Sequence, residues 1–91
     1  MSPSLGGSAP SMAGQIAEGY TLLTAVQLKK VTDAEMEQLH FELEKLLRDI
    51  RAETVSLDDI PALQGRNRRQ SRIVGALQQI QITRMKRRRG I

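Results

Sequence analysis

The C-terminal third of the chain carries the residues best suited to bind an anion. Nine arginines and lysines lie between residues 60 and 91, and this stretch contains no aspartate or glutamate. A guanidinium group is planar and donates hydrogen bonds in a fork that matches the oxygens of a phosphate. Uncompensated arginines need either water or an anionic partner. The pattern therefore predicts a polyanion-binding surface formed by Arg66, Arg68, Arg69, Arg72, Arg84, Lys86, Arg87, Arg88 and Arg89.

The preceding segment has the opposite charge. Residues 32–59 contain nine acids and three bases, a net charge of −6, against +9 for the C-terminal segment. The two segments could instead neutralise each other within one molecule, although exposed ion pairs contribute only about 0–1 kcal/mol each. Contacts between the acid-free basic side of the C-terminal helix and the carboxylates of the preceding helix would overturn the prediction of a nucleic-acid partner.

The arrangement of the bases favours a nucleic acid. Arg68, Arg72, Gln79 and Lys86 fall on one side of a helix, where they could contact successive phosphates. No aromatic residues are interleaved with them, so contact with phosphate or with nucleic-acid shape is expected rather than base stacking. The run from Arg84 to Arg89 would also suit a nuclear import signal or an anionic membrane surface.

Other kinds of chemistry have little support in this sequence. The chain has no cysteine and a single histidine, His40, with no second strong metal ligand beside it. Ser56 and Ser71 lack the neighbouring base and acid that activate a nucleophile, and no glycine-rich phosphate loop is present. We expect no enzymatic activity, metal, cofactor or small-molecule substrate.

Hydropathy and the N-terminal charge pattern bear on location. No apolar run approaches the roughly 20 residues that span a bilayer, so no membrane insertion is expected. The first 28 residues contain no Lys or Arg, unlike a secretory signal or a transit peptide. A cytoplasmic protein is the expectation.

The arginines must be positioned by helices, and the first of these is well marked. Thr32 and Glu35 form a capping-box pattern, and apolar residues then recur every three or four positions. The spacing predicts a helix from Asp33 to about Glu53. Its apolar face would comprise Met36, Leu39, Leu43, Leu46, Leu47 and Ile50.

A second helix should carry the bases. Pro61 suits a first helical turn, because proline has no amide to leave unpaired there, although Gly65 allows a later start. The short polar link between the helices predicts an antiparallel two-helix hairpin over residues 32–86, followed by a basic tail over residues 87–91. The fold class is therefore all-α.

The N-terminal part is less regular. Residues 1–20 are rich in Ser, Gly and Pro at their start and are expected to form a disordered tail. Residues 21–31 could form a short helix, most plausibly over Thr21–Lys30, or an extended segment.

A lone hairpin buries too little apolar surface to be robustly stable. One face must rest on the N-terminal segment, on a second copy or on a large partner. The three-four spacing resembles a coiled coil and suggests an alternative function, a protein-interaction module that homodimerises as a four-helix bundle or docks on an acidic partner. Its interface would comprise Met36, Leu39, Leu43, Leu46, Ile50 and the outward-facing Phe41.

Residues 26–51 also resemble the start of the bacterial large-subunit ribosomal protein twenty-nine family. The matching positions include Thr32-Asp33, Glu35-Met36, Glu42-Leu43 and Leu47, Ile50 and Arg51, followed after a linker by Arg68-Arg69 and Arg72-Ile73. The chain differs from the family in its long N-terminal extension and in the register of the second motif. The resemblance implies a helical hairpin seated on ribosomal RNA near the exit tunnel, with Arg68, Arg69 and Arg72 on RNA phosphate.

Overall fold

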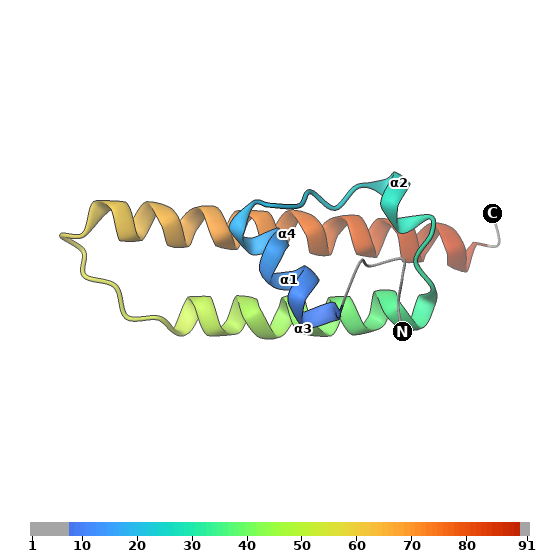
Figure 1. Cartoon of the computed structure of the whole chain (residues 1–91), viewed down its shortest axis with the longest axis horizontal. Helices are drawn as coiled ribbons and strands as arrows, with labels where there is room; N and C mark the ends of the chain where they lie inside the picture. Colours follow the sequence, from blue (N-terminus) through green and yellow to red (C-terminus); the bar gives the residue numbers. More distant parts are fainter. Residues whose placement is uncertain (1–7, 90–91) are drawn as a thin grey trace.

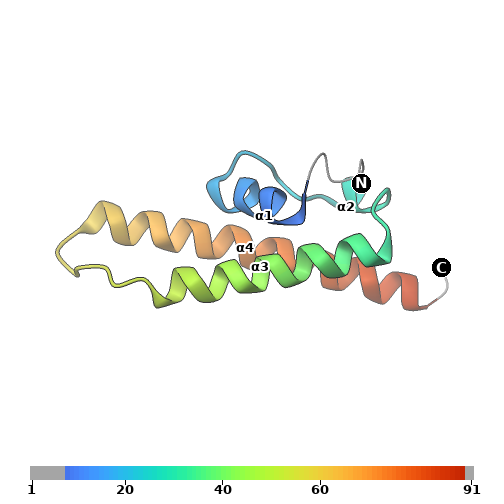
Figure 2. The same ribbon diagram turned by 60° about the horizontal axis from the view of Figure 1, so that its bottom comes forward.

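The computed structural model describes residues 8–89, which are helical apart from short connections and contain no strand. The expectation of an all-α chain is confirmed. The structure has four helices over the described residues: α1 (Ala9–Glu18), α2 (Ala25–Leu28), α3 (Asp33–Ala52) and α4 (Ile60–Arg88). The two long helices, α3 and α4, lie side by side and run in opposite directions, while α1 lies across one face of this pair (Figure 1, Figure 2).

Helix α3 begins where its capping residues predict. The Thr32 hydroxyl accepts a hydrogen bond from the Glu35 amide at 3.1 Å, and the Glu35 carboxylate accepts one from the Thr32 amide at 2.9 Å. These reciprocal bonds satisfy two amides that a helix N-terminus otherwise leaves unpaired. Helix α3 ends at Ala52, one residue before the predicted boundary.

Helix α4 starts at Ile60, with Pro61 in its first turn, so a start after Gly65 is wrong. The Asp59 carboxylate caps it by accepting a hydrogen bond from the Ala62 amide at 3.2 Å. The helix continues to Arg88, which corrects the expectation of a separate basic tail from residue 87. Residues 90 and 91 lie outside the described residues.

Helix α1 is the main correction to the sequence-based prediction. Residues 1–7 of the expected disordered tail lie outside the described residues, but Ala9–Glu18 is a helix. Ala9, Ala13, Ile16 and Ala17 form a buried stripe along it. Three of these residues are alanines, whose small side chains allow a close approach to α3 and α4. Helix α1 thus covers the apolar face of the long helix pair. The N-terminal segment was one of the three covers for this face that the sequence allowed.

Between α1 and α3 the chain is mostly extended. Only Ala25–Leu28 is helical, so a helix over the whole of Thr21–Lys30 is wrong. Thr24 and Gln27 form the capping box of this short helix. Leu23, Leu28 and Val31 anchor the segment in the core.

The core lies where α1, α3 and α4 meet. Its largest fully buried side chains are Leu28, Met36, Leu39, Leu43, Ile73 and Ile80. This corrects the expectation that Met36, Leu39, Leu43 and Ile50 form an interface with another molecule, because α1 and α4 bury them within the chain. Leu46 is partly buried against the same core. Of the expected interface residues, Phe41 alone is exposed, at 55%.

Candidate nucleic-acid interface

Two of the nine candidate bases hold the linker between the long helices. Arg66 Nη1 donates to the main-chain oxygen of Glu53 at 3.1 Å. Arg69 Nη2 lies 3.1 Å from Glu53 Oε1, in an ion pair whose side chains are about one-third exposed. Both arginines thus bind the residue that ends α3. The positive charge of Arg69 is compensated within the molecule.

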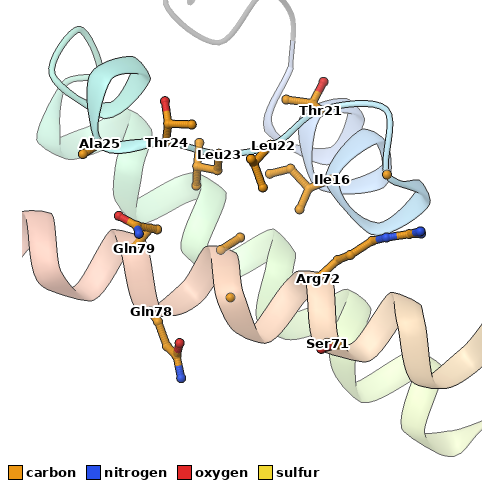
Figure 3. A pocket seen from close by; sticks show the side chains of 13 residues that line it. Ile16, Thr21, Leu22, Leu23, Thr24, Ala25, Ser71, Arg72, Gln78 and Gln79 are labelled. Atoms are coloured by element: carbon orange, nitrogen blue, oxygen red, sulfur yellow. The ribbon is translucent and has the colours of Figure 1, made fainter.

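Arg72 is used at the end of α1. Its Nη1 donates to the main-chain oxygen of Ala17 at 3.0 Å. Figure 3 shows Arg72 extending from α4 toward this end of α1. The last turn of a helix leaves carbonyl oxygens without intrahelical partners. Arg72 satisfies one of them, and its charge has no carboxylate partner among the described residues.

Arg87 joins three segments at the opposite end of the molecule. Its Nη1 donates to Asp33 Oδ1 at 2.7 Å, and its Nη2 donates to the main-chain oxygens of Leu28 at 2.8 Å and Val31 at 2.7 Å. The last turn of α4 is thereby tied to the end of α2 and the start of α3. Arg87 therefore has a structural role within the fold, in addition to being a candidate ligand-binding residue.

These contacts bring two more bases to the end of α4. Lys29 and Lys30 lie between Leu28 and Val31, whose carbonyl groups Arg87 binds. Both lysines are exposed. We name this surface the basic end and define it as Lys29, Lys30, Arg84, Lys86, Arg87, Arg88 and Arg89. The sequence analysis missed the two lysines, although an antiparallel helix pair necessarily places the residues before α3 beside the end of α4.

Most of the basic end is available to a ligand. Among the described residues, Arg84, Lys86, Arg88 and Arg89 have no hydrogen-bond or ion-pair partner. Lys86, Arg88 and Arg89 are exposed, whereas Arg84 is half-buried. Asp33, at the start of α3, pairs with Arg87.

Two adjoining hollows share Arg84 and Arg88. The smaller, about 240 Å³, is completed by Asp33 and Arg87. The larger, about 470 Å³, is completed by His40, Gln81 and Met85. Arg84 and Arg88 are four residues apart and so lie on the same side of α4. An anion in either hollow would therefore contact the guanidinium groups of both Arg84 and Arg88.

Arg68 stands apart from the basic end. It is exposed and has no partner among the described residues. Eighteen positions separate it from Lys86, a distance of about 27 Å along a helix. The nine predicted bases therefore do not form one surface. Four of them make internal contacts, namely Arg66, Arg69, Arg72 and Arg87. Arg68 is isolated, and the other four, Arg84, Lys86, Arg88 and Arg89, belong to the basic end.

The intramolecular alternative from the sequence holds for two residues. Arg69 and Arg87 contact carboxylates at the two ends of α3. Arg68 and Lys86, which belong to the predicted stripe, contact none. Among the described residues, the ion pairs of Arg69 and Arg87 thus lie at the two tips of the long helix pair.

The described residues contain no group of three or more potential metal ligands. No helix among them has the length and hydropathy needed to cross a bilayer. His40, which lines the larger hollow, has its Nδ1 3.5 Å from Glu44 Oε1, one turn away on α3.

Comparisons with protein-family models, with curated proteins and with solved structures found no match for this chain. The resemblance to the ribosomal protein family therefore stays a prediction.

Proposed function

We propose that this protein is a non-enzymatic RNA-binding protein that contacts phosphates through its basic end. The observation that carries the proposal is the convergence there of seven basic residues from two segments. Each guanidinium or ammonium group that meets a phosphate releases a condensed counterion. Arg66, Arg69 and Arg72 leave the proposed binding set, because they lie outside the basic end and each donates a hydrogen bond within the fold. Arg87 also donates such bonds, but it stays in the set because it lines the smaller hollow.

The shape of the basic end favours recognition of the phosphate backbone. The bases are spread over the last turn of α4 and the turn after α2, and no aromatic side chain lies among them. Such a surface binds with little sequence preference. RNA is the partner that the resemblance to a ribosomal protein family implies, and the cytoplasm is the compartment we propose.

The experiment measures RNA affinity across a salt series. A fluorescently labelled RNA hairpin is titrated with the full chain, and binding is followed by anisotropy. The logarithm of the affinity should fall linearly with the logarithm of the salt concentration. The double variant Lys86→Ala/Arg89→Ala, which alters two exposed residues without internal contacts, should bind RNA more weakly. Its salt slope should be smaller by about one for each phosphate that it no longer neutralises.

The matched control is Lys45→Ala/Arg48→Ala. It removes the same charge from the exposed face of α3, outside the basic end. It should retain most of the affinity and nearly all of the slope. Equal losses in the two double variants would show that net charge alone attracts RNA. An affinity independent of salt would contradict phosphate binding outright.

A further inference from the structure

The middle of α4 has an exposed face that the proposed RNA site does not use. No charged residue occurs from Ile73 to Thr83, although α4 is strongly basic on both sides of this stretch. Gly75 and Gln78 are exposed there, and so is Ile82, at 47%. Ser71, just before this stretch, is exposed on the same side of α4. A neutral strip between two cationic regions has the composition of an interface centre with a charged rim.

Apolar side chains project beside this strip. Tyr20 and Leu22, in the segment between α1 and α2, are 83% and 80% exposed, and Val26, in α2, is 67% exposed. A short stretch with three such large exposed apolar side chains is unusual for a surface that meets only water. Their transfer out of water would contribute roughly 1.5–3 kcal/mol for each fully buried side chain.

Of these side chains, Leu22 borders a hollow between this segment and α4. The hollow has a volume of about 650 Å³. Figure 3 shows Leu22, Leu23 and Thr24 on one side of it and Arg72 and Gln79 of α4 on the other. Gly75 and Ala76 contribute to its lining, so the α4 backbone is approachable there. A Cβ atom placed on Gly75 would meet nothing within 4 Å.

We propose that this surface binds a second copy of the chain in a two-fold symmetric dimer. The surface is defined as Tyr20, Leu22 and Val26 together with Ser71, Gly75, Gln78 and Ile82 of α4, and we name it the groove patch. In a two-fold interface the same patch appears on both molecules and must complement itself. The groove patch has what this requires, because the exposed Leu22 lies beside a hollow that can receive a side chain from the second copy.

The charge and the size of the groove patch are also compatible with a second copy of the chain as the partner. Both copies would present the neutral strip to each other, and helices that cross at an angle would move Arg68 and Lys86 of the two copies away from the centre. Arg72 also lines the hollow, and a hydrogen bond to the Ala17 main-chain oxygen holds its guanidinium group at the end of α1. A stable interface buries about 800 Å² on each partner. The molecule measures 49 × 26 × 19 Å, so one broad face along α4 is large enough to supply this area.

This inference is independent of RNA binding. The basic end lies in the last turn of α4 and beyond α2, whereas the groove patch lies over the middle of α4. The dimer can therefore fail while RNA binding succeeds, and the reverse also holds. If both hold, each dimer would present two basic ends.

The experiment is sedimentation equilibrium of the full chain, without RNA, over a wide range of concentrations. The apparent mass should rise with concentration from 10.2 kDa toward twice that value and stop there. Two variants test the groove patch. Leu22→Asp replaces an exposed apolar side chain of the groove patch with a charged one. Gly75→Arg places a long side chain in the hollow, and the monomer has free space for it at this position. Each should weaken the dimer at least about tenfold.

Each variant has a matched control. Leu57→Asp changes an equally exposed leucine in the α3–α4 linker, at 82% against 80% exposure. Gly65→Arg makes the same substitution in α4 at another glycine with free space, outside the groove patch. Thermal melting followed by circular dichroism shows that each variant is folded. Gly75→Arg should be at least as stable as the native monomer, since arginine favours a helix more than glycine does.

The pattern across the four variants decides the matter. A dimer weakened by Leu22→Asp and Gly75→Arg but not by Leu57→Asp or Gly65→Arg supports the proposal. A native chain that stays at 10.2 kDa at every concentration overturns it. A dimer that all four variants weaken equally, or that none of them weakens, also overturns it, as do assemblies that grow beyond two copies.

Discussion

Arg87 and Asp33 lie fifty-four residues apart in the chain and form an ion pair of 2.7 Å at one tip of the long helix pair. The same guanidinium group binds the carbonyl oxygens of Leu28 and Val31. One side chain thus ties α2, α3 and α4 together and positions the lysines between its two carbonyl partners. The proposed RNA site depends on this arrangement, because without it the basic end would lose two of its seven bases.

Arg87 should contribute measurably to folding stability. Hydrogen bonds that involve a charged group contribute about 1.5–3 kcal/mol in favourable cases. We expect Arg87→Ala to lower the free energy of unfolding by about 1–3 kcal/mol in urea denaturation. Arg87→Lys should recover only part of the loss, because an ammonium group lacks the planar fork that reaches three acceptors. The control, Arg88→Ala, removes a neighbouring charge without an internal contact and should stay within about 0.5 kcal/mol of the native chain. Equal effects of Arg87→Ala and Arg88→Ala would contradict a structural role for Arg87.

The long helices were predictable because their signals are local. The capping pattern of Thr32 and Glu35 spans four residues, and both hydrogen bonds that it predicts are present. Pro61 marks the start of α4 by the same kind of local rule. The apolar periodicity of α3 likewise identifies the residues that form the core.

Helix α1 was not predictable from local signals. Gly14 weakens a helix in isolation, and alanine contributes little to an apolar pattern. The helix is stable only where the long pair offers a surface for Ala13, Ile16 and Ala17. The roles of the arginines were hidden for a related reason. A sequence shows which charges exist but not which of them meet carbonyl groups such as that of Ala17, fifty-five residues away.

The attachment of α1 can be tested at Ile16. This residue is buried, at 3% exposure, and is the largest apolar side chain that α1 contributes to the core. We expect Ile16→Ala to reduce the free energy of unfolding by about 2–4 kcal/mol, because apolar burial decreases and a cavity is left behind. Leu57→Ala, at an exposed position in the linker, serves as the control and should change stability by less than about 0.5 kcal/mol. A small effect at Ile16 would mean that α1 is not stably attached to the long pair.

Two glycines should respond in opposite directions to the same substitution. Gly19 ends α1 with a φ of 84°, and a Cβ there would lie 2.9 Å from Arg72 Cζ. Gly19→Ala should therefore destabilise the protein by about 1 kcal/mol or more, through backbone strain and displacement of Arg72. Gly75→Ala introduces a methyl group into free space within α4 and should stabilise the monomer by up to about 1 kcal/mol. Thermal denaturation at a concentration below dimer formation measures both. Stabilisation by Gly19→Ala would show that α1 does not end as described.

The linker contact between Arg69 and Glu53 should be weak and sensitive to salt. Their 3.1 Å ion pair is partly exposed, so solvent screens it and side-chain ordering offsets part of the gain. A double-mutant cycle with Arg69→Ala and Glu53→Ala should give a coupling free energy of about 0.2–1 kcal/mol, which shrinks as salt is added. The reference is the cycle of Arg68→Ala with Glu53→Ala, since Arg68 has no contact with Glu53; its coupling should lie within about 0.3 kcal/mol of zero. Arg66 binds the main-chain oxygen of Glu53, which alanine retains, so its contact persists in every arm of both cycles. Equal coupling free energies in the two cycles would mean that Glu53 responds only to the overall positive charge of α4. The ion pair between Arg69 and Glu53 would then add nothing to stability.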